Sequence, residues 1–165
     1  MKKLVYLILI TSSINAFGQT YGLNEETGLL TYEEVLNFDS MKAEDIYVKV
    51  KEWAILTFRN SEEVIVGDNE PSLVKVNYIT EYFNNIVYTD FFTSMTVRIR
   101  DGAIKVVIDD MREITSNNKA RSYMFKKEGT LRKWKGYVRA YDEIEAKCKG
   151  FTQELAKYIL EKDDW

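Results

Sequence analysis

The sequence contains no histidine. Histidine is the commonest general base and a common metal ligand, so its absence excludes Ser–His and Cys–His nucleophile systems. Neither a Gly-x-Ser-x-Gly motif nor a phosphate-binding Gly-x-x-x-x-Gly-Lys motif occurs. Any acid–base chemistry would fall to carboxylates, lysines and tyrosines. We therefore expect a protein that is not an enzyme, with no catalytic residue, no metal site and no cofactor.

Cysteine is nearly absent as well. Cys148 is the only one, so a disulfide framework within one chain is impossible. The residue falls in an apolar stripe of the last predicted helix, which predicts a buried thiol that packs as a small hydrophobic group. A thiol that joins two chains is the alternative.

No apolar run is long enough to span a bilayer. Residues 4–10 follow Lys2 and Lys3, and Ala16-Phe17-Gly18 offers small residues where a signal peptidase reads them. We interpret residues 1–18 as a signal peptide without a lipid-anchor cysteine, and expect an exported protein, periplasmic or secreted. Its removal leaves 21 basic and 26 acidic residues, a charge of about −5, which argues against nucleic acid as a partner.

The rest of the chain has the composition of one globular domain, with 45% hydrophobic and 30% charged residues. Residues 19–28 are expected to be a flexible lead-in, and 29–165 a single α+β domain. Strands are predicted at 29–39, with a bulge at Glu33-Glu34, and near 64–66 and 73–80. Helical spacing predicts helices at 41–58, with Ser40 as N-cap, and from 131 to 158. Residues 81–90 are interpreted as a loop or irregular hairpin, and 115–136 as a long connector.

The stretch "MTVRIRDGAIKVVI" (95–108) is the clearest local signal. Asp101-Gly102 between two alternating runs predicts a β-hairpin with positive φ at both turn residues. The two-residue loop sets Arg98 opposite Lys105 and Ile99 opposite Ile104. One face of the hairpin is then aliphatic, and the other carries the cations.

The element order is strand, helix, four strands, helix. Together with "LTYEEVLNFDSMKAEDIYVKVKEWA" and "TVRIRDGAIKVVIDDM", it resembles a bacterial exported family with a TATA-binding-protein-like (TBP-like) fold, catalogued as domain of unknown function 4468. The resemblance implies a curved antiparallel sheet of about five strands in the order β-α-β-β-β-β-α, with both helices on one face. It implies no site residues and no DNA binding.

Acidic residues offer few candidates for chemistry. The neighbours Glu33-Glu34 and Asp109-Asp110 lie on predicted strands, where successive side chains point to opposite faces, so we interpret them as solvated charges rather than catalytic pairs. Asp68 and Glu70 lie in "GDNEP", interpreted as a plain turn, with a calcium-binding loop as the alternative.

The cationic hairpin face is the first candidate site, extended by the preceding strand. Guanidinium and ammonium groups on an open sheet could hold carboxylate, sulfate or acidic glycan groups. The alternative is that they reach water or pair with Asp109 and Glu33. The candidate ligand-binding residues are Arg98, Arg100, Lys105, Lys75 and Asn77.

The cationic connector, with Tyr123, Phe125 and Trp134 interleaved, is the second candidate and suits an anionic surface; a solvated loop is the alternative. We predict an exported binding or accessory domain whose partner is an envelope protein or an anionic ligand, of unknown oligomeric state. The alternatives are a carboxylate-dependent hydrolase acting on a glycan and a structural component of a cell-envelope assembly.

Overall fold

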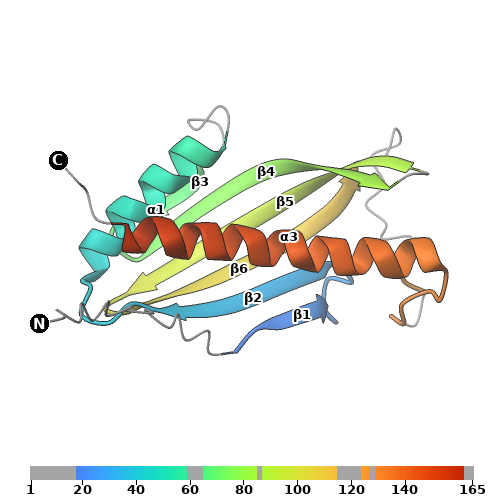
Figure 1. The fold of residues 1–165 in the computed structure, drawn as a ribbon, viewed down its shortest axis with the longest axis horizontal. Coiled ribbons are helices and arrows are strands. Elements are labelled where there is room, and N and C mark those ends of the chain that lie inside the picture. The colour runs from blue at the N-terminus through green and yellow to red at the C-terminus, as the bar shows by residue number, and fades with distance from the viewer. Residues whose placement is uncertain (1–17, 59–64, 85–86, 115–123, 127–128, 162–165) are drawn as a thin grey trace, which may run out of the picture.

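The structure, a computed structural model, describes residues 18–58, 65–84, 87–114, 124–126 and 129–161. Nearly all of the predicted signal peptide and much of the predicted connector lie outside these residues. The described elements, in chain order, are β1 (Thr20–Leu23), β2 (Leu30–Asn37), α1 (Ala43–Thr57), β3 (Ile65–Asn69), β4 (Leu73–Asn84), β5 (Val87–Arg100), β6 (Ala103–Ile114) and α3 (Lys135–Leu160) (Figure 1).

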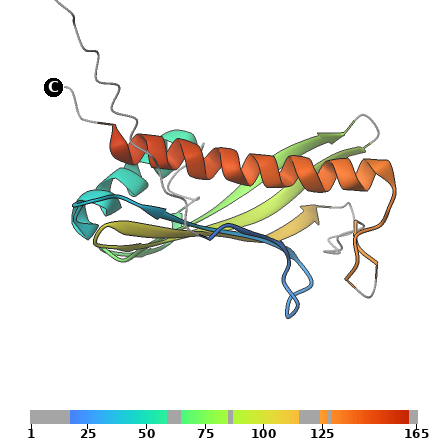
Figure 2. The ribbon, with the colours of Figure 1, turned by 60° about the horizontal axis from the view of Figure 1, so that its bottom comes forward.

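The strands form one antiparallel sheet in the order β1-β2-β6-β5-β4-β3. Helix α1 carries the chain from β2 to the far edge, and β3 to β6 return as a meander until β6 pairs with β2. Both helices cover the same face, and the other face is open (Figure 2). The α+β prediction is confirmed, with six strands rather than about five.

The extra strand is β1, which lies where the sequence indicated only a flexible lead-in. It pairs with β2 from Thr20↔Glu33 to Leu23↔Leu30. Tyr21 holds it in place, because its ring lies 4.5 Å from that of Tyr141 and its hydroxyl donates to the Tyr141 carbonyl at 3.0 Å. The anchor is 120 residues away in the chain, so no local pattern could indicate this strand.

The β5–β6 hairpin confirms the predicted register, with Arg98 opposite Lys105 and Ile99 opposite Ile104. The aliphatic face of the hairpin is buried beneath the helices. Of the two turn residues, however, only Gly102 has a positive φ, of 72°. The turn is held from outside by the β2–α1 connection, since Phe38 N–H donates to the Gly102 carbonyl at 2.8 Å and Gly102 N–H donates to that of Met41 at 2.9 Å.

That same connection changes how α1 begins. Ser40 was predicted as the N-cap, but it adopts a φ of 66°, and the helix starts after Lys42. The Ala43 amide donates instead to the Asp101 carboxylate at 2.9 Å. A turn residue of the hairpin therefore provides the hydrogen bond that usually comes from an N-cap side chain.

Helix α3 confirms the predicted C-terminal helix but begins at Lys135 rather than at 131. Cys148 is buried, as expected, and its burial raises the thiol pKa to about 12. Trp134 and Val138 were placed in the apolar stripe but are 48% and 38% exposed, because the first turns of α3 extend past the ends of β2 and β6 (Figure 1). Neither described helix is long and apolar enough to cross a membrane.

Residues 81–90 were expected to form a loop or irregular hairpin. Instead β4 and β5 stay paired from Leu73↔Arg98 to Asn84↔Val87, so outside 85–86 the segment belongs to a long regular hairpin.

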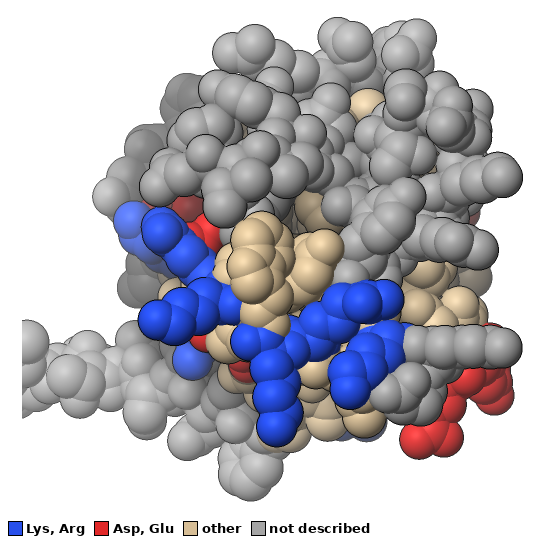
Figure 3. Space-filling view, turned by 90° about the vertical axis from the view of Figure 1, so that its right-hand side faces the viewer, with Lys and Arg blue, Asp and Glu red and all other residues tan. Residues whose placement is uncertain are grey.

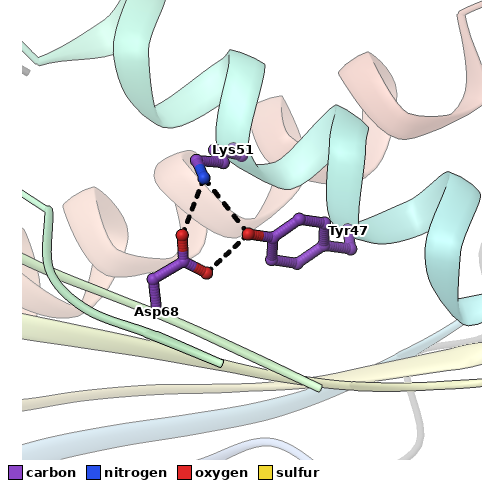
Figure 4. Close-up of polar contacts among 3 residues, drawn as sticks. All are labelled: Tyr47, Lys51 and Asp68. Carbon is purple, nitrogen blue, oxygen red and sulfur yellow. Dashed lines mark hydrogen bonds and ion pairs between the residues drawn. The ribbon is translucent and has the colours of Figure 1, made fainter. Parts of the chain in front are cut away.

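Edge strand β3 is joined to α1 by three polar side chains (Figure 4). Asp68 accepts hydrogen bonds from the Tyr47 hydroxyl at 2.6 Å and the Lys51 ammonium at 2.7 Å, and Lys51 also donates to Tyr47 at 3.2 Å. Asp68 therefore lies in a strand with its carboxylate engaged. No group of three potential metal ligands occurs among the described residues, so nothing there supports the calcium-loop alternative.

The Asp68→Asn variant should reveal this ion pair through its pH dependence. The hydrogen bonds from Lys51 and Tyr47 hold the Asp68 pKa below its ordinary 3.8, so the stabilisation is complete above pH 3.8 and is lost as the pH falls through the folded-state pKa. We expect Asp68→Asn to lower the thermal midpoint at pH 7, and the difference from wild type to shrink as the pH falls below 3.8. Circular dichroism melts measure this, with exposed Asp39→Asn as control. A difference that does not shrink as the pH is lowered would contradict the assignment.

Candidate functional site on the open sheet face

The predicted ligand-binding residues all come from β4, β5 and β6, but they do not form one uniform cationic surface. Arg98, Arg100 and Lys105 are exposed at the hairpin end, whereas Lys75 and Asn77 are half-buried farther along. Lys105 is bound by Glu33 at 2.6 Å. The alternative considered from sequence, a pairing with Glu33, is therefore correct for this lysine. Arg98 and Arg100 are the exposed cations of the predicted set that pair with no acid among the described residues.

Lys75 and Asn77 lie beside a polar cavity. Asn77 Oδ1 accepts a hydrogen bond from Ser94 Oγ at 2.7 Å, and Ser94 pairs across the sheet with Asp109. The cavity has a volume of about 260 Å³. It is lined by Asn24, Thr27, Leu29, Leu30, Thr31, Lys75, Ser94, Asp109 and Asp110.

The two aspartates share this cavity because β6 contains a bulge. Tyr32 pairs with Ile108 and Leu30 with Met111. Between these two pairs the chain advances two residues in β2 but three in β6, so β6 has one extra residue. Asp110 adopts a φ of 52°, and Met111 takes the next buried position. The prediction that Asp109 and Asp110 point to opposite faces is wrong, since it assumed unbroken alternation.

The β1–β2 loop forms the wall of the cavity. The Asn24 side-chain oxygen accepts hydrogen bonds from the amides of Glu26 at 2.9 Å and Thr27 at 3.1 Å, which closes a tight local turn. The loop descends from the sheet on the side away from the helices (Figure 2). A region expected to be flexible thus builds a side of the candidate site.

The charges in the cavity perturb Asp109. Its partial burial raises its pKa, the Lys75 ammonium lowers it, and the charges of Asp110 and Glu33 raise it further; the net shift is upward. A carboxyl with a raised pKa beside a lysine and a second carboxylate is typical of functional sites, although structural ion clusters show it too. The cavity can accept hydrogen bonds from ligand hydroxyls and donate to an anionic group.

The other acidic pair, Glu33-Glu34, is divided between the two faces. Strand β2 alternates without a bulge, so the predicted bulge there is wrong, and Glu34 is buried under α3 rather than solvated. Its carboxylate accepts from the Tyr32 hydroxyl at 2.5 Å and from the hydroxyl of Thr152. Burial and the bond to Glu34 raise the Tyr32 pKa. This cluster belongs to the core.

Solved structures similar to this chain include the following two proteins. A DUF4468 family protein from Bacteroides ovatus ATCC 8483 has a TM-score of 0.66 at 13% identity, over 87% of this chain and 93% of its own. A TBP-like protein from Parabacteroides distasonis ATCC 8503 has a TM-score of 0.61 at 14% identity, over 82% of this chain and 97% of its own. The fold is TBP-like.

The two sequence motifs predicted a resemblance to the DUF4468 family and a TBP-like fold. The similarity to a solved DUF4468 structure and to a solved TBP-like structure confirms this prediction. At these identities the similarity shows the fold alone. No protein-family model and no curated protein matches the chain.

The Asp109→Asn variant tests whether the cavity destabilises the ionised form of Asp109. A pKa raised above the ordinary 3.8 means that the ionised form of Asp109 is less favourable in the folded chain than in the unfolded chain. Asp109 therefore does not reduce the free energy of unfolding below pH 3.8, and it reduces that free energy increasingly as the pH rises through the folded-state pKa. We expect Asp109→Asn to raise the melting temperature at pH 7, with a gain that disappears below pH 3.8. Exposed Asp142→Asn on α3 is the control. A lower melting temperature at pH 7 would show that Asp109 serves stability.

Proposed function

We propose that this chain is an exported binding domain whose open sheet face holds a small ligand with an anionic group and several hydroxyls, as in an acidic sugar. The observation that carries the proposal is the polar cavity, in which Lys75 lies with Asp109, Asp110 and Ser94. A purely anionic ligand would meet two carboxylates there. A ligand that also donates hydroxyl hydrogen bonds satisfies both kinds of group.

The exposed arginines lie on the same open face, farther toward the hairpin turn. Lys75 lies opposite Thr96, and Arg98 follows two residues later on the same face, about 7 Å along the strand. Arg98 and Lys75 are thus placed to hold a carboxylate or sulfate at the mouth of the cavity. The carboxylates and Ser94 behind them face the hydroxyl-bearing part of the ligand.

A carboxylate-dependent hydrolase of a glycan is the second candidate function. It is favoured by the two aspartates that line one cavity and by the raised pKa of Asp109, because glycosidases pair a protonated carboxylic acid with an ionised carboxylate. An acidic sugar fits both the binding domain and the hydrolase, and only the hydrolase would cleave a glycan that contains it.

A structural role in an envelope assembly would use a sheet edge. The edge strands β1 and β3 have only four and five residues. Strand β3 pairs with β4 only over 73–76, so within the described residues the outer edge of 77–84 has no paired strand. That stretch supports addition of a partner strand as the third candidate.

Export is part of the proposal and rests on residues 1–18. Expression of the full sequence in a Gram-negative host should give periplasmic protein with the intact mass of a chain that starts at Gln19. Replacing the apolar residues Leu7 and Ile8 with Asp should leave uncleaved protein in the cytoplasm. Wild-type protein that keeps residues 1–18 in the cytoplasm would overturn the assignment.

The ligand proposal is tested by titrating purified protein with galacturonate, with galactose as the neutral counterpart, and following affinity by calorimetry. Galacturonate should bind and galactose should bind more weakly. Arg98→Ala combined with Arg100→Ala, and Lys75→Ala separately, should each lower galacturonate affinity about tenfold, since each removes a charge-assisted hydrogen bond. Lys149→Ala with Lys157→Ala, on α3, is the charge-matched control.

An unchanged affinity in both open-face variants would mean that the cavity is ordinary surface. The hydrolase candidate predicts release of reducing ends from oligogalacturonate by wild type, and its loss in Asp109→Asn. Binding without turnover supports the binding domain over the enzyme.

A further inference from the structure

A second charged surface lies at the start of α3, away from the open-face cavity. We call it the α3 platform and define it as Arg132, Lys133, Trp134, Lys135 and Val138. All five are exposed, and residues 131–139 contain four cations and no acid. Figure 3 shows Lys and Arg side chains gathered around uncharged ones at this end of the molecule. In the described part of the chain, no acidic side chain pairs with Lys133 or Lys135.

The indole of Trp134 lies flat on the helix backbone. A Cβ placed on Gly136 would stand 2.9, 3.1 and 3.1 Å from three consecutive atoms of the six-membered ring. Such nearly equal distances put that Cβ position over the face of the ring rather than beyond its edge. Gly136 therefore lies against one face of the indole, and the ring of Tyr137 lies beside the indole, with centroids 4.8 Å apart and ring planes at 74°.

The fold does not need this indole. The backbone carbonyl of Trp134 accepts hydrogen bonds from the amides of Tyr137 at 2.9 Å and Val138 at 3.1 Å, so the helix start is made by the main chain. The side chain makes no capping hydrogen bond and is 48% exposed. The result is an exposed aromatic surface flanked by lysines, formed where Gly136 is the second residue of α3.

We infer that the α3 platform binds an acidic polysaccharide: one sugar ring stacks its C–H face on Trp134, and neighbouring carboxylate or sulfate groups bind Lys133, Lys135 and Arg132. The electron-rich indole face attracts the weakly positive C–H groups of a sugar, and the ammonium groups complement the acid groups. This site is separate from the open-face cavity and does not depend on the function proposed for it.

Two other polyanions fit less well. Single-stranded nucleic acid also stacks on aromatic rings and carries anionic groups, but the export proposed for this chain keeps it apart from cellular nucleic acid, and on this point the inference rests on the proposed function. An anionic membrane would require apolar side chains that project into the bilayer. Here the indole is held flat against Gly136 instead of projecting.

The test is fluorescence polarisation of labelled polygalacturonate with the full exported chain, beside labelled dextran, a twenty-residue oligothymidylate and phosphatidylglycerol vesicles. Polygalacturonate should bind in preference to the other three. Trp134→Ala should weaken binding at least about fivefold, from the loss of one stacking contact. Lys133→Ala with Lys135→Ala should weaken it and reduce its salt dependence, whereas Lys149→Ala with Lys157→Ala should not.

Gly136→Ala separates the platform from a merely structural role. Alanine favours the helix, so thermal stability should hold or rise, but its Cβ displaces the indole and polygalacturonate binding should fall. Because galacturonate is also the ligand proposed for the open face, the platform variants are made in the Arg98→Ala with Arg100→Ala background. Polygalacturonate should still bind that background and should bind less once Trp134→Ala is added, so the two sites can fail independently. Unchanged binding in Trp134→Ala or Gly136→Ala, or tighter binding of the oligonucleotide or vesicles, would overturn the inference.

Discussion

The burial of one face of β6 is the constraint on which the rest of the structure depends. This strand pairs with β2 on one side and β5 on the other, and its inward residues Ile104, Val106 and Ile108 are at most 1% exposed. A slip of one residue would put Lys105 and Val107 under the helices, at the cost of desolvating a charge. The same alternation therefore fixes the register of three strands and sends Arg98, Arg100 and Lys105 to the open face.

The bulge in β6 is where this alternation is interrupted, and it makes the candidate site. Beyond Ile108 the extra residue lets Met111 return to the core while Asp109 and Asp110 both face the cavity. Bulges next to functional sites re-aim side chains in this way. Asp110 in a left-handed conformation and Asp109 with a raised pKa both work against stability, which is easier to understand at a binding surface than in a purely structural strand.

Among the described residues, the helix-covered side of the sheet is filled by the core, which includes a buried polar cluster where Glu34 accepts hydrogen bonds from the hydroxyls of Tyr32 and Thr152. The two candidate sites lie on the open face and at the end of α3 that extends past the sheet. The two surfaces differ in kind: one is a cavity of mixed charge, and the other a flat indole among lysines. The TBP-like fold presents both without indicating a ligand, as expected for a scaffold shared by unrelated functions.

From the sequence alone, the hairpin at Asp101-Gly102, its register, both helices, the buried Cys148 and the face that carries the cations could be predicted, because each depends on spacing within one segment. The strand β1, the Asp101 hydrogen bond to α1, the burial of Glu34 and the salt bridge of Lys105 could not. Each joins residues far apart in the chain or requires the exact pairing of two strands. The cavity shows the difference most clearly: every residue of it was visible in the sequence, but only the bulge opposite β2 and the wall built by the β1–β2 loop brought Asp109, Asp110 and Lys75 together, because one extra residue reverses the alternation from which the faces were predicted.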